Sequence, residues 1–159
     1  MQTFLPYADF GKSAACLDNK RLNKQIIECK QILMALDGKT KGWRNHPAVL
    51  MWKGHQGALF DYALCCAEEY RDRAGHPHSL HNWFLEPWNK TSVVYPRWIG
   101  YEPFHSMHRA VLLDKDPEWY SQFDWTEKPA VKVPNGSRMS YPYVWPSKME
   151  LFNPKDKQI

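Results

Sequence analysis

The sequence lacks any apolar run that approaches the roughly 20 residues of a membrane-spanning helix. Its first residues do not place a basic stretch before an apolar one, so we expect no signal peptide. The cysteines have neither the Cys-x-x-Cys spacing of metal sites nor a spacing suited to a disulfide framework. Each lies in a stretch of helical pattern, where a free Cys acts as a small hydrophobe, and we expect a reducing cytoplasm. The four are Cys16, Cys29, Cys65 and Cys66.

The motifs of several enzyme classes are also missing. The chain has no glycine-rich phosphate loop, no nucleophile elbow and no zinc-finger spacing. His76, His78 and His81 form a His-x-His-x-x-His pattern, but no nearby Cys or carboxylate completes a metal site. We therefore expect neither a metal nor another cofactor.

Aromatic and basic residues are in excess. The 159 residues include 8 Trp, 8 Tyr and 7 Phe, and 21 Lys and Arg stand against 17 Asp and Glu. Residues 1–46 carry eight basic and four acidic side chains, whereas residues 47–159 carry 13 of each sign. This composition favours an anionic partner that offers stacking surfaces, and nucleic acid is the first candidate. A core rich in large residues accounts for the aromatics equally well.

The length suits one domain with one core, and no linker divides residues 1–159. Two long helices are predicted over residues 13–36 and 46–73 from apolar residues at spacings of three and four. Ser13 is the expected cap of the first helix, and Gly38 is its expected stop signal.

Gly54 and Gly57 lie inside the second predicted helix, at a cost of roughly 1 kcal/mol each relative to Ala. We therefore expect a neighbouring helix or a ligand close to the backbone there.

The remaining chain is predicted to hold shorter elements. Residues 104–114 have a helical pattern, and Asp116 with Pro117 begins another short helix. Residues 76–103 are expected to form an ordered loop. Residues 126–159 are rich in Pro and aromatics and are expected to lie across the body as an extended tail, with Tyr141, Tyr143 and Trp145 as anchors. Because no alternating run supports a sheet, the predicted fold class is all-α.

A polar stripe borders the apolar face of the first predicted helix. Asp18, Arg21, Gln25 and Glu28 recur at spacings of three, four and three, which places them on one side of a helix. The stripe fits a salt-bridged flank. It equally fits a partly desolvated carboxylate that acts as an acid or base, or that stabilises positive charge as a sugar–base bond breaks. The spacing alone does not choose between the two.

Two histidines belong to the second predicted helix, one at its start and one inside it. Asn45 and His46 precede Pro47 at a helix start, where backbone N–H groups attract phosphate. His55 lies on the buried side beside Gly54, where a lone His is more often a core residue than a catalyst.

Three blocks of residues occur in a recognisable order. Arg21-Leu22 with Glu28 matches a His-Leu-x5-Glu segment, and residues 47–55 match Pro-x6-Gly-His without a gap. Residues 116–120 match Arg-Pro-Thr-Trp-Tyr, with Arg109 upstream. On these blocks the chain resembles the pyrimidine-dimer DNA glycosylase family, which includes the endonuclease V of T-even phage. It is more similar still to a bacterial branch that begins MQTFLPY and continues LDxxRLxKQxxE. The blocks span residues 17–123, and the tail has no counterpart.

The resemblance implies an all-helical enzyme that bends double-stranded DNA, extrudes a nucleotide and cleaves its N-glycosidic bond to leave an abasic site. It assigns the catalytic carboxylate to Glu28. In the family the nucleophile is the α-amine of an N-terminal Thr, which forms a Schiff base and also permits strand cleavage (AP-lyase activity).

This chain differs in ways that leave the nucleophile open. Because Gln2 is not small, Met1 is expected to stay, and its amine then stands out of register with that of the family. Water activated by Glu28 or Asp18 is the alternative, so the AP-lyase step stays open. Arg21 replaces the family's His, and Ile27 replaces an Arg, so the preferred base can differ.

We therefore predict a monomeric, cytoplasmic DNA glycosylase that acts on a damaged or modified pyrimidine. The expected catalytic groups are Glu28, Asp18 and Met1. The expected DNA-binding residues are Arg21, Lys24, Gln25, Asn45, His46, His55, Arg109, Trp119 and Tyr120. Two alternatives remain: a glycosylase against hypermodified phage DNA, such as DNA with glucosylated hydroxymethylcytosine, in anti-phage defence; or a non-enzymatic module that binds bent or damaged DNA.

Overall fold

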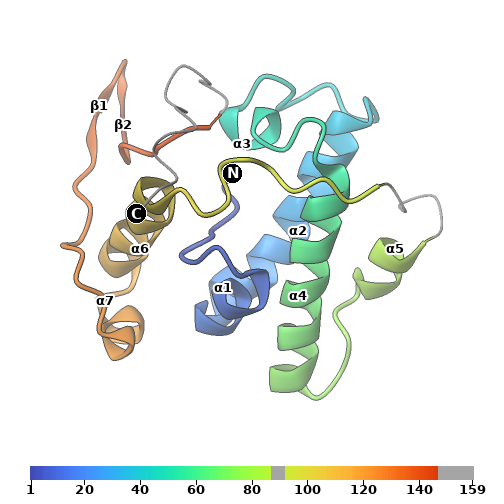
Figure 1. The fold of residues 1–159 in the computed structure, drawn as a ribbon, viewed down its shortest axis with the longest axis horizontal. Helices are drawn as coiled ribbons and strands as arrows, with labels where there is room; N and C mark the ends of the chain where they lie inside the picture. The colour runs from blue at the N-terminus through green and yellow to red at the C-terminus, as the bar shows by residue number, and fades with distance from the viewer. Residues whose placement is uncertain (87–91, 147–159) are drawn as a thin grey trace.

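The computed structural model describes residues 1–86 and 92–146. It is mainly helical, which confirms the predicted class (Figure 1). The helices are α1 (Phe10–Cys16), α2 (Asn19–Leu36), α3 (Pro47–Leu50), α4 (Gln56–Ala74), α5 (His81–Leu85), α6 (Glu102–Lys115) and α7 (Pro117–Tyr120), with a 3-10 turn at Ser121–Phe123. A small hairpin of β1 (Val133–Asn135) and β2 (Arg138–Ser140) follows.

The predicted helix over residues 13–36 is wrong in its first part, because the chain breaks at Leu17. Asp9 caps α1, and Asp18 caps α2 by accepting a hydrogen bond from the Arg21 N–H. Ser13 lies inside α1, where its hydroxyl bonds the backbone of Tyr7. An Asp side chain that satisfies the free N–H groups of a helix start competes with continuation of the preceding helix. Gly38, with φ 73°, follows the end of α2 as expected.

The predicted helix over residues 46–73 is also two helices. Gly54, with φ 81°, lies in the turn between α3 and α4, where a residue with a Cβ would be strained. Gly57 lies in the first turn of α4, and a Cβ there would come within 2.7 Å of the Ser92 carbonyl oxygen. The expected close neighbour is therefore present at Gly57, and it is an extended segment of the chain.

The core forms where α4 packs against α1 and α2. Trp52 and Tyr62 are fully buried in it, and so are Thr3 and Leu5 of the N-terminal segment. The chain therefore begins as a strand-like segment inside the protein, between the long helices and α6 (Figure 1).

The C-terminal part differs from the prediction in two details. The expected loop 76–103 contains α5, and the expected extended tail contains the hairpin, with Val133 opposite Ser140. Tyr141, Tyr143 and Trp145 do pack against the core as anchors. The end of the predicted tail, 147–159, lies outside the described residues.

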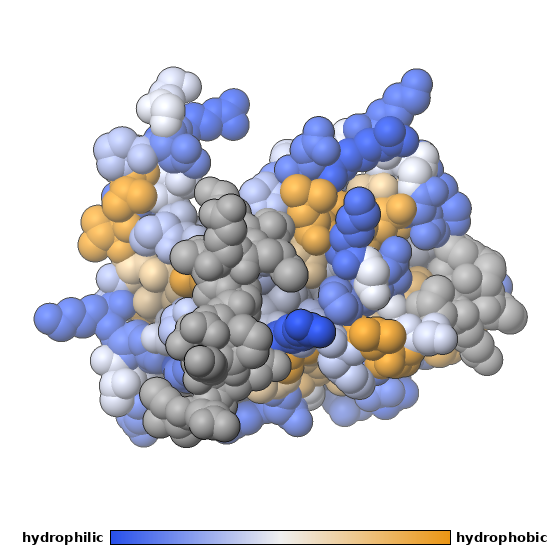
Figure 2. Space-filling view, turned by 45° about the horizontal axis from the view of Figure 1, so that its top comes forward, coloured by the Kyte–Doolittle hydropathy of each residue, from blue (hydrophilic) through white to orange (hydrophobic). Residues whose placement is uncertain are grey.

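Exposed apolar residues are scattered over the surface. Figure 2 shows them as separate orange patches among hydrophilic residues on one face of the molecule. None of the described helices has the length and hydropathy needed to cross a membrane.

Candidate active site at the start of the chain

The polar stripe of α2 runs from the start of the helix to its middle. Asp18 precedes the first turn, and Glu28 lies ten residues further on, a rise of about 15 Å along the axis. The two carboxylates therefore do not act on one reacting atom, and each end has its own surroundings.

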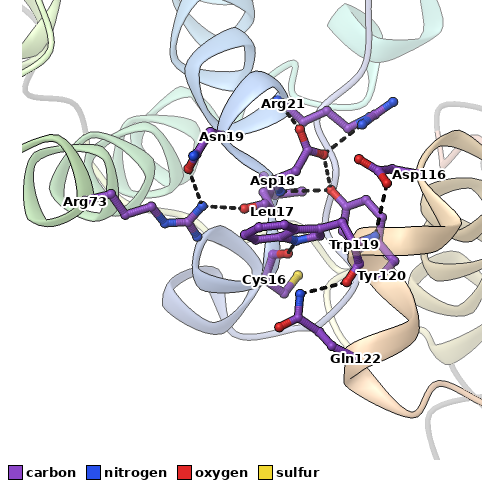
Figure 3. Close-up of polar contacts among 10 residues, drawn as sticks. All are labelled: Cys16, Leu17, Asp18, Asn19, Arg21, Arg73, Asp116, Trp119, Tyr120 and Gln122. Carbon is purple, nitrogen blue, oxygen red and sulfur yellow. Dashed lines mark hydrogen bonds and ion pairs between the residues drawn. The ribbon is translucent and has the colours of Figure 1, made fainter.

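Asp18 is held by fixed partners on both carboxylate oxygens (Figure 3). One oxygen accepts the Arg21 backbone N–H at 3.0 Å. The other accepts the Tyr120 hydroxyl at 2.7 Å and the Arg21 guanidinium at 2.8 Å. Burial alone would raise the pKa of Asp18, but the hydrogen bonds from Tyr120 and Arg21 outweigh it and lower that pKa. This carboxylate is an ionised structural group that joins α2 to α7.

The residues around Asp18 connect three helices. The Trp119 indole donates to the Cys16 carbonyl at 2.9 Å, and Arg73 of α4 donates to the Leu17 carbonyl at 2.6 Å. Tyr120 has no exposed surface, and its ring is stacked on Trp125. The stacking of Tyr120 on DNA stays a prediction, and in this structure the ring packs against protein. Trp119 is partly exposed and anchored through its N–H.

Glu28 lies in a different environment at the far end of the stripe. It is 7% exposed, and one oxygen accepts the Gln2 backbone N–H at 3.0 Å across 26 residues of sequence. Its other oxygen is 3.8 Å from the ammonium of Lys24, a side chain that is 67% exposed. A nearly buried carboxylate therefore lies beside the start of the chain with one oxygen near an exposed cation.

Gln25 explains why the N-terminal segment lies at Glu28. Its amide oxygen accepts the Phe4 N–H at 2.7 Å, and its amide nitrogen donates to the Gln2 carbonyl at 2.9 Å. The Tyr62 hydroxyl donates to the Phe4 carbonyl at 2.5 Å. Gln25 is only 1% exposed, so the structure uses this predicted DNA-binding amide to hold the segment in place.

Further contacts hold the N-terminal segment from the opposite side. The Trp52 indole donates to the Thr3 hydroxyl at 3.0 Å, and the Leu5 N–H donates to His108 Nδ1 at 2.8 Å. Burial, with a smaller contribution from His105, lowers the pKa of His108 to about 3. His108 is therefore neutral at ordinary pH, as its role as acceptor requires. The start of the chain is thereby fixed in position relative to Glu28.

Aromatic rings from distant parts of the chain lie next to the N-terminal segment. Burial lowers the pKa of His46, and the positive amine of Met1 lowers it further. Burial, Tyr141 and the charge of Glu28 raise the pKa of Tyr143. Trp145 packs edge-on against His46, with ring centroids 6.0 Å apart. Tyr143 lies 5.2 Å from Trp145 and 5.9 Å from His108 between ring centroids, and His108 accepts the Leu5 N–H. The rings next to His46 therefore reach the N-terminal segment, whose Gln2 N–H bonds Glu28 beside Lys24.

Other predicted DNA-binding residues are placed elsewhere or engaged. Arg109 is 11% exposed in its side chain and pairs with Glu102 and Glu127. His55 Nδ1 lies 2.8 Å from the Val94 carbonyl oxygen. Asn45 is exposed beside His46. Arg109 thus has its charge compensated within the protein.

No group of His, Cys, Asp and Glu that could hold a metal is found in the described part of the chain. His78 of the His-x-His-x-x-His pattern instead contacts Asn23 and accepts the Leu80 N–H. A surface cavity of about 460 Å³ is lined by Asp9, Asp61 and Glu68 and by no basic residue, which disfavours an anionic ligand there.

The sequence was not sufficient to identify the aromatic residues of the site. Tyr143 and Trp145 were expected only as anchors, and Trp43 carried no motif. The sole signal was the excess of aromatics, because residues about 100 positions apart have no shared spacing.

Comparison with protein families shows the family to which the chain belongs. A family model described as pyrimidine dimer DNA glycosylase matches residues 1–82, which include the N-terminal segment, Glu28 and His46. Because this match covers just over half of the 159 residues, the chain belongs to the pyrimidine dimer DNA glycosylase family. Neither the curated proteins nor the solved structures contain a significant match. Membership of a DNA glycosylase family implies that the chain binds DNA.

Proposed function

We propose that this protein turns a damaged or modified pyrimidine nucleotide out of double-stranded DNA and cleaves its N-glycosidic bond, with Glu28 at the reacting sugar. The observation that carries the proposal is the pairing of the nearly buried Glu28 carboxylate with the Gln2 N–H at 3.0 Å. It places an acid–base group beside the start of the chain, within the part that matches the family.

The chemistry suits a carboxylate in this position. When the bond between C1′ and the base breaks, its electron pair leaves with the base and positive charge develops on the sugar. An ionised carboxylate next to the sugar stabilises that charge, and more so where little water reaches it. Extrusion is required because C1′ is shielded while the base is stacked in the duplex.

Two nucleophiles are compatible with the arrangement. In the first route Glu28 takes a proton from water while the water oxygen bonds to C1′. In the second the amine of Met1 bonds to C1′ as the C1′–base bond breaks, the base leaves with the electron pair, and the amine loses a proton. The C1′–O4′ bond then breaks as O4′ takes up a proton, and the resulting imine permits strand cleavage. The second route is supported by the hydrogen bond from the Gln2 N–H to Glu28 at 3.0 Å, because the Met1 amine belongs to the preceding residue. Borohydride, which reduces an imine to a stable amine, distinguishes the routes by trapping a covalent complex in the second alone.

The central test is Glu28→Gln, which keeps the size of the side chain and removes its charge. The wild type and variant are offered single-lesion duplexes: a thymine dimer, an oxidised pyrimidine and glucosylated hydroxymethylcytosine. We expect abasic sites from the wild type and a loss of about 10²–10⁴-fold in the variant with DNA binding retained. Glu68→Gln, an exposed carboxylate in the acidic cavity, is the matched control and is expected to be fully active.

Each other outcome has a defined meaning. Release from the glucosylated duplex alone supports a role in anti-phage defence. Binding without release from any duplex supports a non-enzymatic module. Full activity of Glu28→Gln refutes the assigned role of the carboxylate.

A further inference from the structure

Trp43 has an unusual backbone and an unusual exposure. Its φ of 65° lies in the left-handed region, which bulky residues rarely adopt without constraint from the surrounding structure. Its side chain is 59% exposed, so core packing does not explain its position. The indole is presented to solvent edge-on to His46, with ring centroids 5.4 Å apart.

The C-terminal segment brings two more rings to the same place. Trp145 contacts His46 from another side at 6.0 Å, and Tyr143 lies 5.2 Å from Trp145. In Figure 1 the red segment that follows β2 runs toward α3, whose N-cap is His46. Four rings from two distant segments of the chain therefore form one cluster.

This aromatic cluster lies next to the proposed reacting groups. Tyr143 lies edge-on to His108 with ring centroids 5.9 Å apart, and His108 accepts the Leu5 N–H of the N-terminal segment. The cluster therefore adjoins the segment whose Gln2 N–H bonds Glu28. Because His46 is half-buried, its lowered pKa keeps the ring neutral, and a neutral ring stacks on a base without a charge to desolvate. The surface suits a flat, uncharged ring attached to the sugar that Glu28 faces.

We propose that Trp43, His46, Tyr143 and Trp145 form an aromatic subsite that receives the extruded pyrimidine base of the attacked nucleotide. The proposal rests on the proposed glycosylase function and adds the residues that recognise the base. Two of the four rings lie beyond residue 82, where the family match ends. The C-terminal segment of this chain therefore sets which base the site accepts.

The test separates the base from the DNA backbone. Binding is measured in the Glu28→Gln background, so that the base stays attached, to a duplex with one thymine dimer. The second probe is the same duplex with a tetrahydrofuran abasic analogue in place of the nucleotide attacked. Because each base stacked on an aromatic side chain contributes about 1–3 kcal/mol, Trp43→Ala is expected to weaken binding of the dimer duplex by about tenfold or more. Binding of the tetrahydrofuran duplex is expected to be unchanged.

Two further variants complete the design. Trp43→Phe is expected to restore most of the preference for the dimer duplex, because it keeps an aromatic face. Tyr95→Ala removes a ring that is 55% exposed and borders the acidic cavity, and it is expected to bind both duplexes as the parent does. Thermal unfolding of each variant verifies that it is folded.

Three results would overturn the subsite. Trp43→Ala could lose the same affinity for both duplexes, or lose affinity for neither. The parent protein could also bind the two probes with equal affinity. These readouts are independent of catalysis. Failure to release any base refutes the proposed function, whereas failure of the binding difference refutes only the subsite.

Discussion

The two ends of the polar stripe on α2 contain the same kinds of polar side chain and use them differently. At the start of the helix, Asp18 has fixed donors on both oxygens from α2 and α7. Further along, Glu28 holds a backbone N–H of the chain's first residues on one oxygen, while the other lies 3.8 Å from an exposed lysine. A carboxylate whose oxygens are all satisfied by the protein serves the fold, whereas one with an oxygen near a solvent-exposed partner is available for chemistry.

The largest expected effect tests the Glu28 end. Replacing Glu28 with Gln is expected to raise the barrier to base release by about 3–5 kcal/mol, because the charge that stabilises the sugar is lost. The free energy of unfolding is expected to change far less, since the amide oxygen can still accept the Gln2 N–H. Single-turnover release and urea unfolding measure the two quantities. A large loss of stability with normal release would reverse the comparison.

Asp18→Asn is expected to show the opposite pattern. The free energy of unfolding should fall by about 2–3 kcal/mol, because the Tyr120 hydroxyl and Arg21 lose a charged acceptor. The rate of base release per folded molecule should be close to that of the wild type. Asp72→Asn, whose side chain is 67% exposed, is the control and should be neutral. Abolished release in a folded Asp18→Asn protein would restore Asp18 as a catalytic group.

Acid is expected to lower the free energy of unfolding through His108 and through Asp18 over different pH ranges. His108 has a pKa near 6.5 when unfolded and about 3 when folded, so between these values only the unfolded chain binds its proton. As the pH is lowered through this range, the free energy of unfolding therefore decreases by about 1.4 kcal/mol per pH unit because of this residue. The contribution of Asp18, whose folded pKa is lowered, is complete above 3.8 and is lost only as the pH falls through the folded value.

Urea unfolding from pH 6.5 to 4 measures the effect. His108→Asn retains an acceptor for the Leu5 N–H and should flatten the dependence by about one proton. An unchanged slope in this variant would show that His108 does not carry the effect.

The smallest expected effect on stability concerns Lys24. Lys24→Ala should change the free energy of unfolding by no more than about 0.5 kcal/mol, because its ion pair with Glu28 is long and exposed. It should nevertheless lower the slope of log affinity for DNA against log salt by about one. Lys20→Ala, one turn closer to the Asp18 end, is the comparison and should alter the slope less. Equal slopes for the two variants would mean that DNA does not favour the Glu28 end.

The helical class could be predicted from the sequence, but the breaks in the helices could not be placed correctly. Apolar spacing continues through Leu17 and through the turn at Gly54, so periodicity alone predicts continuous helices there. The breaks depend on local competition: Asp18 caps a new helix, and Gly54 adopts a positive φ. Gly57 was a usable signal, because a glycine inside a helix indicated close contact before Ser92 was known to supply it.

The candidate site was predictable only where one helix carries it. The spacing of α2 placed Glu28, Gln25 and Asp18 on one side, but it could not assign their roles. Gln25 and Asp18 differ from Glu28 through partners that are 21 to 102 residues away, such as Phe4 and Tyr120.

By itself the sequence determined that the chain is helical, that basic charge gathers in its first 46 residues, and that a carboxylate-bearing stripe borders the core. These properties follow from periodicity and composition, which act over a few residues. The tertiary structure decided which carboxylate is satisfied, where the start of the chain lies, and which rings meet beside Glu28. Those outcomes depend on contacts between segments far apart in sequence, because burial and hydrogen-bond partners are set only when the helices, the N-terminal segment and the tail pack together.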